Sequence, residues 1–192
     1  MLLKALSFAA ALALAGPISA STITWTATLG PEAVGATGSG STTIIYDDVA
    51  HTLDISANWS GLSGTTSVAH IHCCVATPGT GSIGVAVTPS TLPGFPVGVT
   101  SGTYDIVLDL TASATYTSSF VTTFGGGTIA GAEAALIAGL NGGVAYFNIH
   151  SSTFGGGEIR GFPAVVPEPS IAGLLLSIGL ASSFARSRNN RA

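Results

Sequence analysis

Three of the four histidines in this chain have a spacing that suggests a metal site. His70 and His72 are separated by one residue, and His150 lies far along the chain in a second alternating segment. Residues i and i+2 of an extended strand share a face, so His70 and His72 should point the same way. Two imidazoles from one strand and a third from another can hold a divalent ion about 2 Å from each nitrogen, with one position open. This arrangement suits copper or zinc as Cu(II) or Zn(II).

A third alternating segment supplies further polar side chains. Glu158 and Arg160 flank Ile159, and burial of the apolar residues would turn both of them to the face that carries the histidines. We expect this to be the outer face of a sheet. There Glu158 would be a partner outside the ligand set that orients one imidazole by accepting its free N–H. Two other interpretations stay open. The histidines form a hydrogen-bonded structural cluster through Glu158 and Arg160, or they act directly in catalysis.

Cys73 and Cys74 follow directly after the histidine segment and are the only cysteines. In an oxidising compartment they should not remain free. We favour a disulfide between the two neighbours, which would stiffen a turn. They could instead be soft ligands that complete a metal site, which would favour Cu(I), or they could link to another molecule.

The N-terminal segment 1–20 has the pattern of a secretory signal peptide. Lys4 is its only charge, 5–15 is apolar, and Gly16-Pro17 stops a helix shortly before the small residue Ala20. We therefore expect residues 1–20 to be removed on export.

The C-terminal segment 166–192 has three parts. Pro167-Glu168-Pro169 is followed by the apolar run 171–185 and then by arginines that resist crossing a membrane. At about 1.5 Å per residue, the predicted transmembrane helix is shorter than a hydrocarbon core of roughly 30 Å. The tail resembles the bacterial PEP-CTERM sorting signal. This resemblance implies processing by an exosortase at the inner membrane of a Gram-negative bacterium, and then release to the periplasm, cell surface or extracellular matrix.

The remaining segment, 21–165, is the size of one domain. It is acidic, and Arg160 is its only fixed positive charge, which argues against nucleic acid and anionic lipid as partners. Its periodicity of two predicts an antiparallel β-sandwich or flattened barrel, with Trp25 and Trp59 in the core and one short helix at 130–140. The strands are expected at 23–29, 41–47, 52–59, 67–72, 83–87, 104–110, 144–150 and 158–162.

Three sequence blocks in this segment occur in a recognisable order. They are His-Ile-His at 70–72, Asn-Ile-His at 148–150 and Gly-Gly-Glu-Ile-Arg-Gly at 156–161. Together they resemble the CHRD domain, which is named from chordin and occurs in many exported bacterial proteins. The resemblance implies an immunoglobulin-like β fold and an exported location, but no well-established biochemical activity. Cys73-Cys74 stands where many members have a Gly-Pro-like turn.

The His-x-His strand with a distant third histidine also resembles, locally, the copper site of copper–zinc superoxide dismutases. Only His51 remains for the zinc ligands that the dismutase pattern needs, so dismutase activity is not expected. The chain is therefore interpreted as an exported non-catalytic module of the cell surface or exopolysaccharide matrix. The alternative is a copper- or zinc-binding module of the cell envelope that uses His70, His72 and His150.

Overall fold

The computed structural model describes residues 21–167. The expected signal peptide, most of the sorting tail with its apolar helix, and Glu168 and Pro169 of the sorting motif lie outside these residues. Within the described part, no helix is long and apolar enough to cross a membrane.

The described chain is built mainly of antiparallel strands, which confirms the all-β prediction. Each of the eight expected strands is present, with ends shifted by up to a few residues. The ninth strand, β9, is only two residues long and shows no periodicity. The strands are β1 (Thr22–Pro31), β2 (Ser39–Asp47), β3 (Thr52–Ser60), β4 (Thr66–His72), β5 (Val85–Val87), β6 (Gly102–Asp109), β7 (Tyr146–Ser151), β8 (Ile159–Gly161) and β9 (Ala164–Val165).

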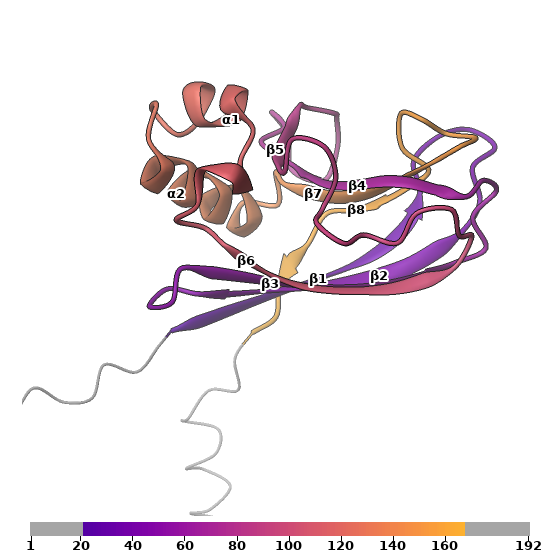
Figure 1. The fold of residues 1–192 in the computed structure, drawn as a ribbon, viewed down its shortest axis with the longest axis horizontal. Helices are drawn as coiled ribbons and strands as arrows, with labels where there is room; N and C mark the ends of the chain where they lie inside the picture. The colour runs from indigo at the N-terminus through magenta and orange to yellow at the C-terminus, as the bar shows by residue number, and fades with distance from the viewer. Residues whose placement is uncertain (1–20, 168–192) are drawn as a thin grey trace, which may run out of the picture.

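The strands form one curled sheet that folds over into two layers, so the fold is sandwich-like (Figure 1). The strand order is β5-β4-β7-β8-β1-β2-β3-β6, and β9 pairs with β1. Strand β1 joins the layers because most of it pairs with β2, whereas Gly30 and Pro31 pair with Arg160 and Ile159 of β8. The upper layer, β5-β4-β7-β8, carries all three histidines of interest.

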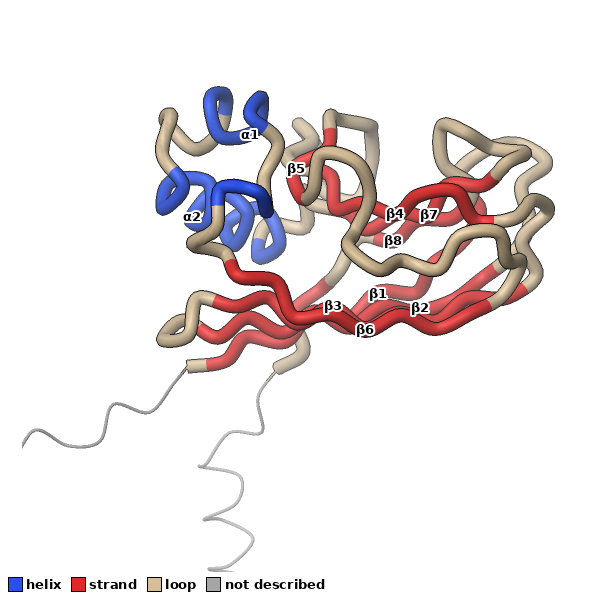
Figure 2. The backbone as a smooth tube through the Cα atoms, viewed as in Figure 1, coloured by secondary structure: helices blue, strands red, loops and turns tan. Residues whose placement is uncertain are grey.

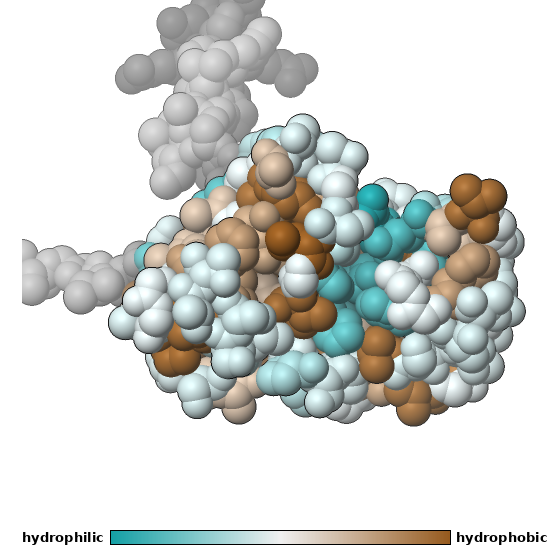
Figure 3. All heavy atoms as spheres, turned by 90° about the horizontal axis from the view of Figure 1, so that it is seen from above, coloured by the Kyte–Doolittle hydropathy of each residue, from teal (hydrophilic) through white to brown (hydrophobic). Residues whose placement is uncertain are grey.

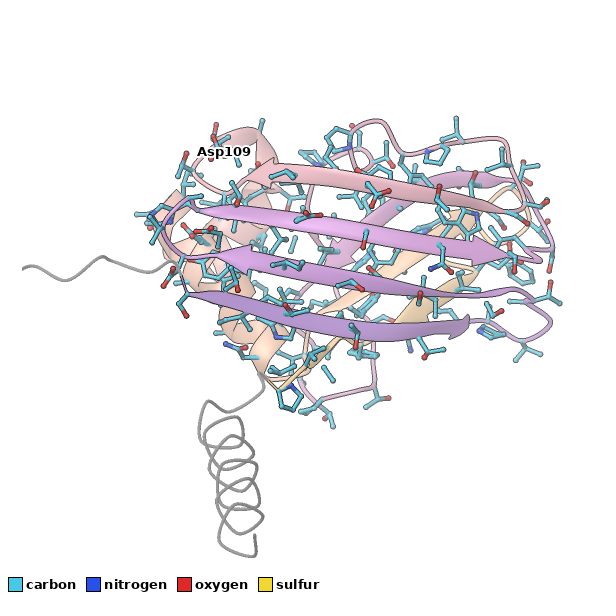
Figure 4. All side chains as sticks on the ribbon, turned by 90° about the horizontal axis from the view of Figure 1, so that it is seen from below. Asp109 is labelled. Carbon is cyan, nitrogen blue, oxygen red and sulfur yellow. A yellow bond between two sulfur atoms is a disulfide. The ribbon has the colours of Figure 1, made fainter. Side chains whose placement is uncertain are left out.

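The lower layer consists of four long strands lying side by side, β1, β2, β3 and β6 (Figure 4). Asp109 ends β6, where its carboxylate accepts hydrogen bonds from the backbone N–H of Thr111 (2.8 Å) and the Thr111 hydroxyl (2.6 Å). These bonds lower the pKa of Asp109 and terminate the strand in a tight turn.

The hydrophobic core lies between the two layers. Trp25 is fully buried, Trp59 is nearly so, and both are confirmed as core residues. From the upper layer the inward residues are apolar and have no exposed surface: Ala69, Ile71, Phe147, Ile149 and Ile159. Strand alternation therefore sends the polar residues of β4 and β7 to the opposite, outer face.

Helices pack at one end of the two layers (Figure 2). The expected helix is confirmed as α2 (Ile129–Asn141), with the Thr128 hydroxyl accepting from the N–H of Gly131 at 3.0 Å as its N-cap. The expectation of a single helix was wrong, because the chain also forms α1 (Ser118–Thr123) and the 3₁₀ turn η1 (Ser113–Thr115). Both are too short to show a helical period in the sequence.

The long connection between β4 and β6 runs along the free edge of β4. The Leu92 N–H donates to the Ala69 carbonyl at 3.0 Å, and the Gly98 N–H donates to the Thr66 carbonyl at 2.8 Å. The connection also contains β5, which pairs with Ile71 and His72. This segment, 73–101, closes the edge of the sheet and supplies backbone carbonyls beside the histidines.

Candidate metal centre

The structure brings His70, His72 and His150 together. His70 and His72 alternate with the buried Ala69 and Ile71 on β4, and His150 lies on the neighbouring strand β7. One ring nitrogen from each of the three lies within 4.8 Å of the other two. Alternation on two adjacent strands is thus sufficient to gather the three imidazoles on one face.

The three histidines lie on the outer face of this layer, as predicted, but other segments cover that face. His70 and His72 are only 7% and 8% exposed, and His150 is partly buried. Segment 73–101 lies beside them, and the loop that follows β7 contacts His150. Viewed from above, the outer side of this layer shows a hydrophilic patch flanked by hydrophobic atoms (Figure 3).

Each imidazole is hydrogen-bonded to one backbone carbonyl. His70 Nε2 bonds to the Ser90 carbonyl at 2.9 Å, His72 Nδ1 to that of Ile83 at 2.7 Å, and His150 Nδ1 to that of Gly155 at 2.9 Å. A carbonyl oxygen only accepts, so the bonded nitrogen must carry the proton. The tautomer of each neutral ring is therefore set, with a lone pair on its other nitrogen.

Those other nitrogens have no hydrogen-bond partner among residues 21–167. His70 Nδ1, His72 Nε2 and His150 Nε2 are buried and unpaired. A buried polar atom without a partner costs about 1–3 kcal/mol, so three in one place call for an explanation. Burial lowers the pKa values of His70 and His72 against the opposing effect of their carbonyl partners. Both rings are therefore neutral at pH 7, the form in which imidazole binds a metal.

The His72 ring is also held by stacking. It lies parallel to the Tyr146 ring, with centroids 4.6 Å apart and an angle of 2° between the planes. The guanidinium of Arg160 is 5.1 Å from the Tyr146 centroid, at a distance typical of a cation–π contact. Arg160 therefore supports the site through Tyr146, without a hydrogen bond to any of the three histidines among the contacts of the described residues.

The expected role of Glu158 as a histidine partner was wrong. Strand β8 begins only at Ile159, so strand alternation does not apply to Glu158. Its carboxylate is fully buried and accepts from the backbone N–H groups of Ser63 and Gly64. Burial alone would raise the pKa of Glu158, but hydrogen bonds from Ser151, Ser63 and Gly64 outweigh it and lower the pKa.

The fourth histidine, His51, is separate from the cluster. It lies in the turn between β2 and β3, where its Nδ1 is 2.8 Å from a carboxylate oxygen of Glu133 on α2. This hydrogen bond raises the pKa of His51.

Cys73 and Cys74 form a disulfide with each other, as favoured from the sequence. In this state they offer no thiolate to a metal and no link to another molecule. The disulfide lies against α2 at Gly139, where an added Cβ would be 2.3 Å from Cys73 Sγ.

Several parts of the site could not be predicted from the sequence. The carbonyls of Ser90, Ile83 and Gly155 come from loops and leave no sequence signal. Asn148, by contrast, shares the face of His150 by simple alternation, and its side chain is 1% exposed beside the cluster. The two-residue spacing of Asn148 and His150 in the sequence could therefore have indicated that Asn148 belongs to the site.

Fold and site together define a small all-β module with a buried cluster of three histidines on one layer. The family model of the CHRD domain matches residues 25–162, and the chain belongs to the CHRD domain family. CHRD domains are non-enzymatic modules and are typically extracellular. No curated protein and no solved structure matches the chain.

Proposed function

We propose that this CHRD-domain protein is an exported, non-catalytic module that holds one Zn(II) or Cu(II) ion through His70, His72 and His150. The observation that carries the proposal is the set of three buried, unpaired ring nitrogens, each on an imidazole whose other nitrogen donates to a backbone carbonyl. Imidazoles that bind metals in proteins are held in this way.

A purely structural histidine cluster explains the geometry less well. Such a cluster needs a donor for each acceptor, but every N–H of the three neutral rings is already used on a carbonyl. The three lone pairs then face one another without a proton between them. A cation removes this conflict, because one ion accepts all three lone pairs at once.

The metal content of the isolated protein tests the proposal. The protein should be exported in its host and purified without a polyhistidine tag, and its copper and zinc measured by mass spectrometry. We expect close to one ion per chain in the parent and in His51→Ala, and much less in His150→Ala. A parent that carries no more metal than His150→Ala would refute the proposal.

The location is proposed from the sequence ends. We propose export by the signal peptide and then recognition of the tail from Pro167-Glu168-Pro169 onward by an exosortase in the inner membrane of a Gram-negative bacterium. The protein would then reach the periplasm, the cell surface or an exopolysaccharide matrix. The acidic, hydroxyl-rich domain and its CHRD membership support an extracellular destination.

A further inference from the structure

A fourth polar side chain lies among the three histidines. Asn148 is directly opposite His70 in the register of β4 and β7, and it precedes His150 by two residues on the same face. Side chains opposite one another on antiparallel strands have Cβ atoms about 5 Å apart, and diagonal neighbours about 7 Å. Asn148 therefore occupies the middle of the cluster.

The orientation of the Asn148 amide is fixed by its neighbour. Its Nδ2 donates to a carboxylate oxygen of Glu32 at 3.2 Å. An ionised carboxylate only accepts, so the amide nitrogen must face Glu32 and the amide oxygen must face the other way. The second carboxylate oxygen of Glu32 accepts from Arg160 Nη1 at 3.1 Å, and this ion pair holds the Glu32 side chain in place.

Close packing secures this arrangement. Gly157 covers the contact between Glu32 and Asn148, and a Cβ there would lie 2.2 Å from Glu32 Oε2 and 2.9 Å from Asn148 Nδ2. Only glycine fits at this point, and its φ of +128° is also one that other residues rarely adopt. The amide therefore has little freedom to turn over.

The amide oxygen that results is also buried and unpaired. Within the part of the chain that the structure describes, Asn148 Oδ1 joins His70 Nδ1, His72 Nε2 and His150 Nε2 as an acceptor with no donor. Asn148 lies directly opposite His70 and diagonal to His72 in the register of β4 and β7, so its side chain adjoins both imidazoles. One water molecule could donate to only two of these four acceptors, whereas one cation satisfies them all.

We propose that Asn148 Oδ1 is the fourth ligand, which makes the centre a closed site of three nitrogens and one oxygen. This inference rests on the proposed function. Four-coordinate sites closed by protein ligands are structural, whereas catalytic zinc sites keep a position for water or substrate. The ion therefore stabilises the upper layer, and the centre presents no open position to a reactant.

Electron paramagnetic resonance of the full chain with one equivalent of Cu(II) tests this directly. In the parent, exchange into D₂O should give no deuterium modulation from an equatorial water, because Asn148 occupies that position. In Asn148→Ala a water should enter, with a clear deuterium signal and a shift of the parallel g and hyperfine values. The matched control is Asn58→Ala, which removes an exposed asparagine of β3 and should leave the spectrum unchanged.

Affinity gives the second measurement. Competition with a chelating dye should show Zn(II) binding about 10- to 100-fold weaker in Asn148→Ala, the range for lost supporting groups at a metal site. A parent that binds no metal would refute the proposed function. A parent that binds metal with an equatorial water, or an Asn148→Ala that matches it in spectrum and affinity, would refute the fourth ligand alone. The D₂O measurement on the parent decides the question even if Asn148→Ala does not fold.

Discussion

At the scale of single residues, the cluster is arranged by backbone carbonyls rather than by acidic side chains. The carbonyls of Ser90, Ile83 and Gly155 fix the three tautomers. A carboxylate partner would add negative charge and favour protonation of the rings, whereas a carbonyl does so less. His70 and His72 therefore stay neutral without a compensating ion pair.

The first prediction concerns the pH dependence of the metal-free protein. Burial lowers the pKa values of His70 and His72 below 6.5, so the unfolded chain binds more protons than the folded one as the pH falls below this value. Stability from the neutral rings is then present above pH 6.5 and is lost towards lower pH. The urea concentration at the unfolding midpoint, measured with a chelator present, should be lower at pH 5 than at pH 7. Replacing both residues, His70→Gln and His72→Gln, should flatten this slope.

His51 provides a control, because its effect on the pH dependence of stability has the opposite sign. Its pKa is raised by the hydrogen bond to Glu133, so its contribution is present below pH 6.5 and is lost as the pH rises through its folded pKa. The metal-free His51→Ala protein should therefore lose more stability than the parent as the pH falls from 7 to 5. Equal urea midpoints at pH 7 and pH 5 in both parent and His51→Ala would contradict this account.

At the scale of elements, strand alternation explains what the sequence could predict and what it could not. A period of two identified eight strands and assigned the faces of β4 and β7 correctly, because inward residues such as Ile71 and Phe147 must be buried. The same rule could not show what covers the outer face, since segment 73–101 reaches it by contacts distant in sequence. It failed for Glu158 because the strand begins one residue later.

The core of the upper layer gives the second prediction. Phe147 has no exposed surface and lies between the layers, so Phe147→Ala should lower the free energy of unfolding by about 3–5 kcal/mol. Val107→Ala on β6, where the side chain is largely exposed, is the matched control and should change it by less than about 0.5 kcal/mol. Denaturant unfolding measures both, and similar losses would place Phe147 outside the core.

The contact between the disulfide and α2 gives the third prediction. A methyl group at Gly139 would overlap Cys73 Sγ and approach Cys74 Sγ at 3.0 Å. Gly139→Ala should therefore destabilise the fold by about 1–3 kcal/mol, although alanine is the better helix former. Gly30→Ala in β1, where an added Cβ meets nothing within 4 Å, is the control. A Gly139→Ala protein as stable as the parent would show that the disulfide does not pack on this helix.

At the scale of the whole molecule, we propose separate tasks for the domain and for the C-terminal segment. The CHRD family assignment covers residues 25–162, and the tail follows it directly in the sequence. Composition and motif order were enough to predict the family, because they depend on short blocks such as 70–72 and 156–161. They could not show how the Asn148 amide is oriented, since its orientation depends on Glu32, which is distant in sequence.

The fourth prediction concerns this tail. Replacing Pro167-Glu168-Pro169 by alanines should leave export intact but abolish processing and sorting, because the exosortase-type enzyme would lose its recognition motif. Fractionation and mass spectrometry of the parent and the variant measure this. The sorting proposal is wrong if both proteins reach the same compartment with the same mass.

The central claim is that the upper layer is held together by one metal ion on three histidines from two strands. The unfolded chain does not gather these ligands, so binding should stabilise the folded state by about 2.7 kcal/mol when the free ion is at 100 times its Kd. The most direct test is the melting temperature of parent, His72→Ala, His150→Ala and His51→Ala during titration with Zn(II) or Cu(II). We expect a saturable rise at one equivalent in the parent and in His51→Ala, and little or none in the other two. No shift in the parent, or an equal loss in His51→Ala and His72→Ala, would contradict the account.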